Sequence, residues 1–269
     1  MPVQEEKVLF GDGKYRTMQT FSVCGEKLAS ILLECPYDNL NDPAYTSYFL
    51  DLVRLKLAGY QNKYGYGILP FDGHDLIANH YTVCMIRNGK PVPIMGMKSV
   101  TLERCRTHKV SFPMGEFYSK PEFADYRKAI ENLIAAHDKR PGELGYNGSF
   151  TISPEVRNNR ELVKEIRDIG FSYIVQYYRD YKIPTQVAVA LVPFKVPESK
   201  RQIGWDTIKL NGRPLPPTPC DFFFGEEIAL MVGEKENEGG RALAKKYEQM
   251  WNARLTLGES KLETIKKAA

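Results

Sequence analysis

The sequence lacks the long apolar runs and the basic blocks that would place it in a membrane or on nucleic acid. None of its hydrophobic stretches approaches the roughly 20 residues that a membrane-spanning helix requires. The formal net charge is only +4, and no sustained block of Lys and Arg gathers it into a nucleic-acid-binding patch. The N-terminal stretch MPVQEEKVLF lacks the basic start and apolar run of a signal peptide. We therefore expect no membrane span and no nucleic-acid partner.

Cysteine is scarce and is not arranged in pairs. The 5 cysteines are scattered along the chain, and no Cys-x-x-Cys motif occurs. This distribution does not fit a disulfide framework. A reduced, cytoplasmic protein is the simplest interpretation.

Internal repeats, low-complexity tracts and clear linkers are absent as well. With 43% hydrophobic and 26% charged residues, the composition is that of a globular protein that can bury a core. The proline-rich stretch GRPLPPTPC (212–220) is the best candidate for a domain boundary, but it resembles a long ordered loop. We expect one domain over residues 1–269, with a helical C-terminal extension over about 239–269.

Hydrophobic periodicity and turn residues predict helices alternating with strands. Asn88-Gly89 predicts a tight hairpin between two strands within 81–102, because both residues tolerate positive φ. A strand–helix–strand unit with antiparallel strands on either side gives a mixed sheet and an α/β (α+β) fold. The expected helices are 43–67, 122–140 and 154–181, and the expected strands are 146–153, 184–194 and segments within 203–215 and 221–233.

The stretch FDGHDLIANH (71–80) concentrates two aspartates and two histidines in ten positions. Its residue types suit a metal site, a catalytic cluster or the polar edge of a loop. The metal reading is the weakest, because the spacing matches no His-Glu-x-x-His motif or its relatives. His80 stands at the start of a strand and has the pKa range of a general base, although a histidine at the edge of the core explains it more simply.

Several motifs follow one another in a familiar order over residues 46–232. LKLAGY (55–60) is similar to a Leu-Arg…Tyr segment, with Lys56 in place of arginine, and FDGHDLIANH to an Asp-x-x-Asp-x-x-Ala-x-His run. The other matches are VSFPMGEFY (110–118), FTISPEVRNN (150–159), VPESKRQIGW (196–205) and LNGRPL (210–215), with a hairpin through Gly96. In this order the chain resembles the acyltransferase branch of the GNAT superfamily, in particular the acyl-homoserine lactone synthases and the N-acyl amino acid synthases.

The resemblance implies a GNAT acyltransferase fold, in which a mixed central sheet contains a splayed pair of parallel strands and is flanked by helices. The splayed strands would be 149–153 and 186–192. The implied reaction moves an acyl group from acyl-CoA, or from acyl-phosphopantetheine on an acyl carrier protein, to a small amine or amino acid, with no metal. The resemblance assigns the thioester donor to Phe150, Ile152, Arg157, Asn158, Asn159 and Arg160.

The resemblance also implies an acceptor site. Asp72 and Asp75 would line it and hold the amine, with Lys56 paired to one of them; alternatively the two aspartates only shape the turn before a strand. His80, Glu116 and Glu143 are the candidates for the general base that removes the amine proton.

Two further features of the sequence have structural explanations that are simpler than catalytic ones. The aromatic run 222–224 could line an acyl tunnel, but core packing explains it more simply. Cys84 follows His80 in the same strand, and we interpret it as a small buried hydrophobic residue rather than a nucleophile.

The chain departs from the family pattern where phosphate would bind. Residues 157–162 read RNNREL and contain no glycine, although close approach of a pyrophosphate to the backbone favours glycine. Ser99 stands where an arginine is expected, next to Lys98, and a charged pair is missing near 146–149. These departures favour a phosphopantetheine donor. They also favour one alternative, a catalytically silent binding protein with this fold. A second alternative, an acyl-homoserine lactone synthase, fits the acidic motif at 71–80 but not the missing charges.

Overall fold

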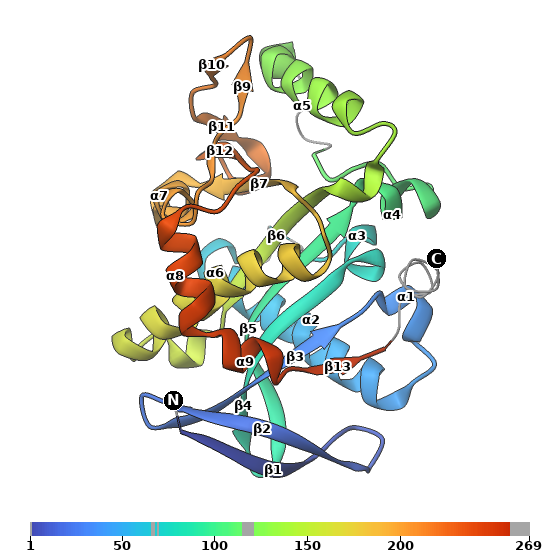
Figure 1. The fold of residues 1–269 in the computed structure, drawn as a ribbon, viewed down its shortest axis with the longest axis vertical. Coiled ribbons are helices and arrows are strands. Elements are labelled where there is room, and N and C mark those ends of the chain that lie inside the picture. Colours follow the sequence, from blue (N-terminus) through green and yellow to red (C-terminus); the bar gives the residue numbers. More distant parts are fainter. Residues whose placement is uncertain (1, 66–67, 69, 115–120, 259–269) are drawn as a thin grey trace. The chain divides into compact units, whose positions relative to one another are not determined.

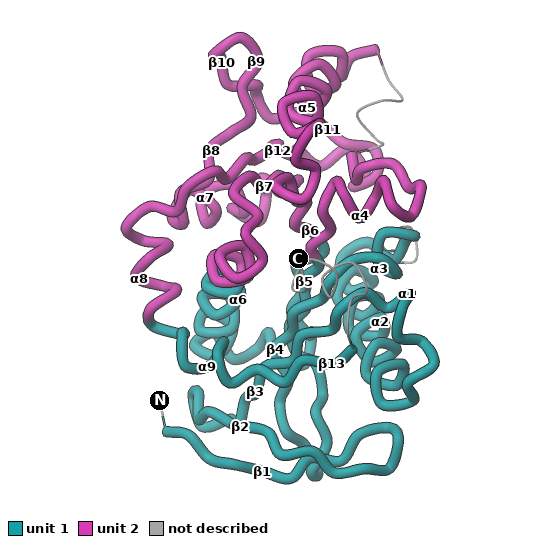
Figure 2. Tube along the Cα trace, turned by 45° about the vertical axis from the view of Figure 1, so that its right-hand side comes forward, with its two compact units in different colours: residues 1–98, 149–173, 246–269 teal, residues 99–148, 174–245 magenta. Residues whose placement is uncertain are grey.

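The structure, a computed structural model, describes residues 2–65, 68, 70–114 and 121–258. The chain divides into two compact units (Figure 2). Unit 1 comprises residues 1–98, 149–173 and 246–269, and unit 2 comprises residues 99–148 and 174–245. Each unit is therefore assembled from separate segments of the chain. The single domain expected over 1–269 stays a prediction.

Unit 1 is built on antiparallel strands that follow one another along the chain (Figure 1). β1 (Val3–Leu9), β2 (Tyr15–Val23), β3 (Glu26–Leu33) and β4 (Asn79–Arg87) pair in this order, and β5 (Lys90–Thr101) follows β4. Asn88 and Gly89, between β4 and β5, have φ of 50° and 68°, and the predicted hairpin is confirmed. The meander β1–β3 was not predicted from the sequence.

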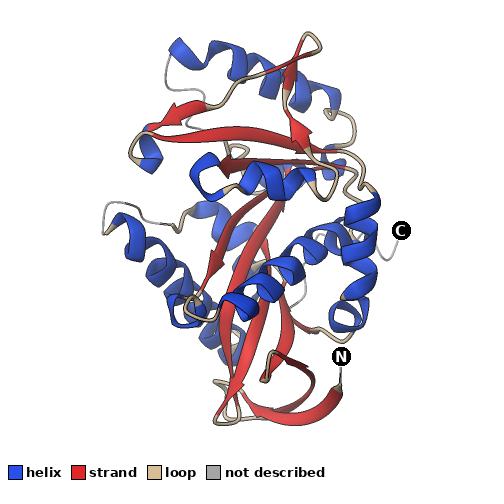
Figure 3. Cartoon of the chain, turned by 90° about the vertical axis from the view of Figure 1, so that its left-hand side faces the viewer, coloured by secondary structure: helices blue, strands red, loops and turns tan. Residues whose placement is uncertain are grey.

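Helices cover both faces of β3, because its side chains point alternately to opposite sides. Ala29, Ile31 and Leu33 belong to the core cluster that includes the buried face of α2 (Pro43–Tyr64). On the other face, the Ser30 hydroxyl forms a hydrogen bond with the Tyr173 hydroxyl of α6 (Arg160–Asp180). Figure 3 shows helices on both sides of these strands.

The boundaries of α2 follow from local chemistry. The Asp42 side chain accepts hydrogen bonds from the backbone N–H groups of Ala44 and Tyr45, which caps the first turn. Gly65 ends the helix with a positive φ of 58°. The predicted helix over 43–67 is thus confirmed as far as Tyr64. The shorter helices of unit 1 are α1 (Pro36–Asn39), α3 (Gly73–Ile77) and α9 (Glu248–Asn252).

Of the helical extension expected over 239–269, residues 259–269 lie outside the described residues, and residues 239–258 are only partly helical. α8 (Glu238–Lys246) and α9 are helices, but β13 (Leu255–Leu257) is a strand that pairs in parallel with Ile31–Leu33 of β3. β2 pairs with the start of β3, through Leu28, Lys27 and Glu26. β13 therefore pairs with the same edge of β3 as β2, further along the strand. A long-range pairing of this kind leaves no periodic signal in a local stretch of sequence.

Unit 2 contains the parallel strand pair. β6 (Leu144–Ile152) pairs with β7 (Thr185–Leu191) from Leu144↔Thr185 to Tyr146↔Val187, and no pairing between them is described beyond this register. β7 pairs antiparallel with β12 (Glu226–Gly233), which also pairs with β11 (Thr218–Cys220) and β8 (Asp206–Thr207). The remaining elements are β9 (Lys209–Leu210), β10 (Arg213–Pro214), α4 (Leu102–Thr107), α5 (Ala124–Ala136) and α7 (Val196–Arg201). The expected parallel strands joined by a helix are confirmed, within a mixed α/β fold.

The crossover helix α6 begins later than predicted. The segment Pro154–Val156 forms a short 3-10 turn, in which the Ser153 hydroxyl accepts from the Glu155 N–H. The side chain of Asn159 then accepts from the Leu162 N–H at 3.1 Å, so that Asn159 caps the helix proper. Among the described residues, no helix is long and apolar enough to cross a membrane.

The expectation that Phe222–Phe224 pack in the core is wrong for Phe222 and Phe224, and Phe223 is only partly buried. The side chains of Phe222 and Phe224 are 52% and 61% exposed. They lie in the turn that links β11 to β12, where Phe224 adopts the left-handed conformation with φ of 55°. Cys84, by contrast, is fully buried as predicted.

Candidate functional site

The motif at 71–80 folds around a short capped helix in unit 1. Asp72 is the N-cap of α3 and accepts from the His74 N–H at 2.9 Å, while the Asp75 carboxylate accepts from the Asp72 N–H at 3.0 Å. This reciprocal arrangement is a capping box, and it requires the spacing of three residues seen in the motif. The structure therefore gives both aspartates a local structural role.

The same two carboxylates also bind lysines from two other elements. Asp75 forms ion pairs with Lys56 of α2 and with Lys98 of β5, the latter at 2.7 Å, and Lys98 also reaches Asp72 at 2.9 Å. We call these four residues the lysine–aspartate cluster. The predicted association of Lys56 with this motif is confirmed. The sequence analysis did not assign Lys98 to this site and named it only as the residue next to Ser99, which stands where an arginine is expected.

Burial divides the lysine–aspartate cluster into a hidden part and an accessible part. The side chains of Lys56 and Asp75 are 1% and 0% exposed, whereas the Asp72 side chain is 57% exposed. Asp72 is thus the member of the cluster that a ligand can reach most readily. Asp75 is buried, and its ion pairs hold the two lysines in place.

The charges of the cluster shift the pKa values of its members. Burial raises the pKa of the Asp75 carboxyl, but the Lys56 and Lys98 ammonium groups outweigh it and keep the pKa below its usual range. Burial opposes ionisation of Asp72 too, yet hydrogen bonds from His74 and the Lys98 charge hold its pKa low. Both aspartates therefore remain carboxylates at neutral pH. Burial lowers the pKa of Lys56, with Lys98 adding to the effect and Asp75 opposing it.

His80 lies beneath the cluster and is fully buried. Its Nε2–H donates to the Asp75 carbonyl oxygen at 2.7 Å, and its Nδ1 lies 3.4 Å from Lys56 Nζ. Burial, followed by the Lys56 charge, lowers the pKa of His80 to about 3. The ring is therefore neutral at neutral pH, and its buried position matches the simpler explanation drawn from the sequence. Its assignment as general base stays a prediction.

The predicted donor residues also lie in unit 1, at the end of β6 and the start of α6. The Arg157 guanidinium donates to the carbonyl oxygens of Ile152 and Gly59 at 3.0 and 3.1 Å, and to the Asn62 side chain at 3.0 Å. A Cβ on Gly59 would lie 2.3 Å from the Thr151 side chain. Arg157 thus joins α2 to β6 at a point of close approach, and this joining role was not predicted from the sequence.

The other donor candidates differ in exposure, and Phe150 and Ile152 are only partly exposed. Asn158, Asn159 and Arg160 are exposed where α6 begins, and the first N–H groups of a helix have no partner within it. Phe150 stacks on Phe171 of α6, with ring centroids 5.9 Å apart. Within β6, Ser149 has a positive φ of 58°, the mark of a bulge that redirects a strand.

The two remaining candidates for a general base lie elsewhere. Glu143 ends the 3-10 turn Pro141–Glu143 of unit 2 and forms an ion pair with Arg140 at 3.1 Å. Glu116 lies outside the described residues. Among the residues that the structure does describe, no group of three or more His, Cys, Asp or Glu side chains is placed to hold a metal ion.

Comparison with known proteins supports the fold. No family model matches the chain, and no curated protein matches it. Among solved structures, the CoA-dependent acyl-homoserine lactone synthase BjaI, solved with SAM and isopentyl-CoA, is 9% identical, covers 87% of this chain and 95% of its own, and superposes with a TM-score of 0.50. The acyl-homoserine lactone synthase LasI covers 87% of this chain and 100% of its own, at 10% identity and a TM-score of 0.48. FeeM, an N-acyl amino acid synthase from uncultured soil microbes, covers 78% and 91%, at 10% identity and a TM-score of 0.46.

The similarity to BjaI extends over most of both chains. The sequence identity is so low that the similarity indicates a shared fold and nothing further. The predicted GNAT-like architecture, a mixed sheet with a parallel strand pair and flanking helices, is confirmed. The chain therefore shares its fold with the acyl-homoserine lactone synthase BjaI.

Proposed function

We propose that the protein is an N-acyltransferase that moves an acyl group from a thioester to a small amine or amino acid. The observation that carries the proposal is the accessible carboxylate of Asp72 at the end of an otherwise buried lysine–aspartate cluster. The fold shared with BjaI supports the same reaction class. The donor is acyl-CoA or acyl-phosphopantetheine on a carrier protein.

The reaction needs a bound amine, a held thioester and a proton acceptor. The bound ammonium first loses one proton to solvent water. The free amine nitrogen then attacks the thioester carbonyl carbon, the C–N bond forms and the C–S bond breaks, and the leaving thiolate takes up the second proton that the nitrogen loses. Asp72 binds the ammonium form of the acceptor. Because its pKa is held low, Asp72 anchors the acceptor and does not serve as the base. Lys56, Lys98 and Asp75 fix the position of that anchor.

The donor binds in the same unit, along β6 and at the start of α6. Strand residues 149–152 offer backbone hydrogen-bonding groups to the pantetheine arm, and Arg160 with the N–H groups of the first turn of α6 receives phosphate. Both arginines are exposed, but the Arg157 guanidinium is engaged by carbonyl oxygens. We therefore assign the phosphate contact to Arg160 in preference to Arg157.

The test is detection of acyl transfer by mass spectrometry of the products. Acyl-CoA and acyl-carrier-protein donors are each combined with a panel of amines and amino acids. The panel includes SAM with isopentyl-CoA, the pair named for BjaI, which tests the alternative of an acyl-homoserine lactone synthase. An acylated amine that forms with wild type and at less than a tenth of that rate with Asp72→Asn supports the proposal. Transfer that is insensitive to this change removes Asp72 from the mechanism.

A catalytically silent thioester-binding protein is the second candidate. The stretch RNNREL (157–162) favours it, because the loop before α6 has no glycine to admit a pyrophosphate closely. The outcome that selects this candidate is saturable thioester binding by calorimetry together with no acylated product across the whole panel.

A further inference from the structure

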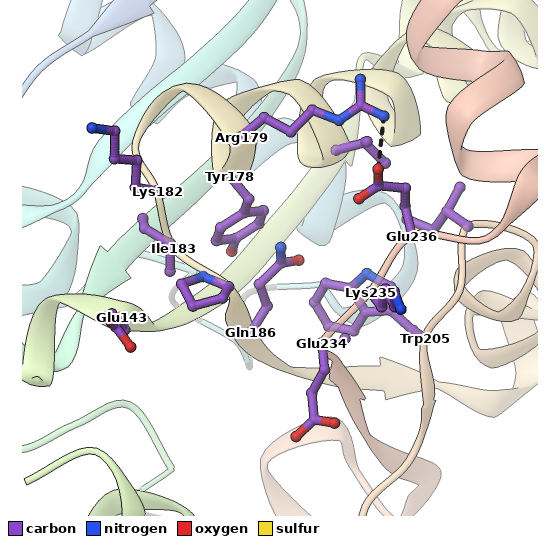
Figure 4. A pocket seen from close by; sticks show the side chains of 14 residues that line it. Glu143, Tyr178, Arg179, Lys182, Ile183, Gln186, Trp205, Glu234, Lys235 and Glu236 are labelled. Carbon is purple, nitrogen blue, oxygen red and sulfur yellow. Dashed lines mark hydrogen bonds and ion pairs between the residues drawn. The ribbon is translucent and has the colours of Figure 1, made fainter.

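The pocket of unit 2 (Figure 4) has the size of a small-molecule site, but its main polar and aromatic groups are closed to a ligand. Its volume is about 470 Å³. The Gln186 Oε1 atom in its lining is buried. Trp205 is 5% exposed, and the Lys200 Nζ lies 3.6 Å from its ring centroid. A hydroxyl group that a ligand can reach lies instead in unit 1, on α2.

Tyr60 shares one face of α2 with Lys56 and Gly59, because residues three and four positions apart in a helix lie side by side. Lys56 pairs with Asp75, so this face carries the lysine–aspartate cluster. On the same face, a Cβ on Gly59 would lie 2.3 Å from the Thr151 side chain of β6. Tyr60 therefore belongs to the face of α2 that meets both the proposed acceptor anchor and the strand proposed to bind the donor.

The fold makes no use of the Tyr60 hydroxyl. Other tyrosine hydroxyls hold elements together through hydrogen bonds, namely those of Tyr45, Tyr48, Tyr173, Tyr178 and Tyr247. The Tyr60 hydroxyl forms no hydrogen bond with any residue that the structure describes, and its side chain is only partly buried. Its ring is held beside Tyr64, with centroids 6.3 Å apart. The hydroxyl is thus positioned by its ring and remains available to a ligand.

The Tyr60 hydroxyl is a hydrogen-bond donor at neutral pH. Burial, and after it the Asp75 charge, raises its pKa well above the usual range. A protonated phenol has one O–H to donate. Asp75 does not take this hydrogen bond, because its carboxylate is already occupied by Lys56 and Lys98. An unused O–H therefore lies on the accessible side of the lysine–aspartate cluster.

We propose that Tyr60 is a catalytic residue of the acyl-transfer site, where its hydroxyl donates a hydrogen bond to the thioester carbonyl oxygen. This role rests on the proposed function. As the amine nitrogen attacks, the π electrons of the C=O bond move onto the oxygen, which becomes negatively charged. When the C–S bond breaks, the C=O bond forms again and the electron pair of the broken bond leaves with sulfur. The Tyr60 O–H keeps its proton throughout and stabilises the charged oxygen between these two steps.

Tyr60→Phe tests the role, because it keeps the ring and removes only the hydroxyl. Removal of one such donor typically lowers kcat by about a hundredfold or more. We expect a loss of this size, with both KM values within about twofold of wild type and an unchanged melting temperature. The assay is the mass-spectrometric one, with the donor and acceptor that wild type uses. Tyr64→Phe makes the same change one turn further along α2 and should leave kcat unchanged.

A binding measurement tests the contact without turnover. Octanoyl-CoA is compared by calorimetry with octyl-CoA, the thioether that lacks the carbonyl oxygen, and no amine is present. The same pair on a carrier protein serves if wild type uses that donor. Wild type should bind the thioester more tightly than the thioether. Tyr60→Phe should lose this preference and bind the thioether as wild type does, whereas a purely structural role would weaken both ligands equally.

The possible outcomes separate this role from the proposed function. If wild type transfers an acyl group and Tyr60→Phe matches its kcat, the role of Tyr60 is overturned and the proposed function stands. The role also falls if Tyr60→Phe keeps the preference for the thioester, if it melts early, or if Tyr64→Phe loses as much activity. If wild type acylates no amine with any donor, the proposed function falls and this role falls with it.

Discussion

Asp72 and Asp75 belong to the same motif and the same capping box, but they differ in burial and therefore in role. Asp75 is 0% exposed and lies between two lysines, while the Asp72 side chain is 57% exposed. Removing one partner of a buried ion pair typically costs about 3–5 kcal/mol, because the other charge is left uncompensated. Asp75→Asn should therefore lower the melting temperature strongly. Thermal unfolding followed by circular dichroism measures this.

Asp72→Asn is the matched control for Asp75. Asparagine is as good an N-cap as aspartate, and the lost ion pair is half exposed, so that stability should change by less than about 1 kcal/mol. The acceptor KM should rise while donor binding persists. An Asp72→Asn protein with a wild-type acceptor KM would show that the carboxylate does not hold the amine.

The buried side chain of Lys200 leads to a prediction about how the stability of the fold depends on pH. It is 4% exposed, donates to the Asn147 side-chain oxygen at 3.2 Å, and forms no ion pair among the described residues. Burial lowers its pKa from 10.5 to about 7. Between these two values the unfolded chain binds the proton and the folded chain does not. The contribution of Lys200 to stability therefore rises with pH across this window, by at most about 1.4 kcal/mol per pH unit.

Lys200→Met removes this linkage. Methionine is similar in length and carries no charge, so the variant should be more stable than wild type at pH 7, and the difference should shrink toward pH 10.5. Urea unfolding at several pH values measures the difference directly. A constant difference across the window contradicts a lowered pKa at Lys200.

At the scale of elements, the junction between β6 and α6 carries two exposed arginines that differ in their hydrogen bonds. The Arg157 guanidinium contacts α2 and the end of β6, whereas Arg160 lies in the first turn of α6. Arg157→Ala should lower the melting temperature, and Arg160→Ala should weaken thioester binding by the worth of one charge-assisted contact, roughly 1.5–3 kcal/mol. Calorimetry and thermal unfolding on both variants separate the effects. Weaker binding caused only by Arg157→Ala would return the phosphate contact to Arg157.

The elements that were predictable from sequence are those defined by neighbouring residues. The Asn88-Gly89 turn and the helix that begins at Pro43 depend on residues within a few positions of one another. β13 was not predictable, because its partner Ile31–Leu33 lies far away in sequence. At the site, Lys56, Asp72 and Asp75 could be grouped by spacing and resemblance. The contacts of Arg157 could not, since their acceptors belong to α2 and the preceding strand.

For the whole molecule, unit 1 depends on three separate segments of the chain. The last of them supplies β13, whose pairing with Ile31–Leu33 covers an edge of β3. A chain that stops at residue 253 should leave this edge open, and an open apolar edge promotes association. We expect lower solubility and a lower melting temperature than in a chain that stops at residue 258. Light scattering and thermal unfolding of the two truncated proteins measure this, and equal behaviour would show that β13 is dispensable.

The pairing of β13 with β3 also sets the order in which the protein can be made. The ribosome synthesises β13 more than two hundred residues after its parallel partner β3. Until Leu255–Leu257 emerge, the nascent chain holds Ile31–Leu33 without that neighbour. Contacts between such distant segments slow folding, so unit 1 cannot be completed before Leu255–Leu257 have been synthesised.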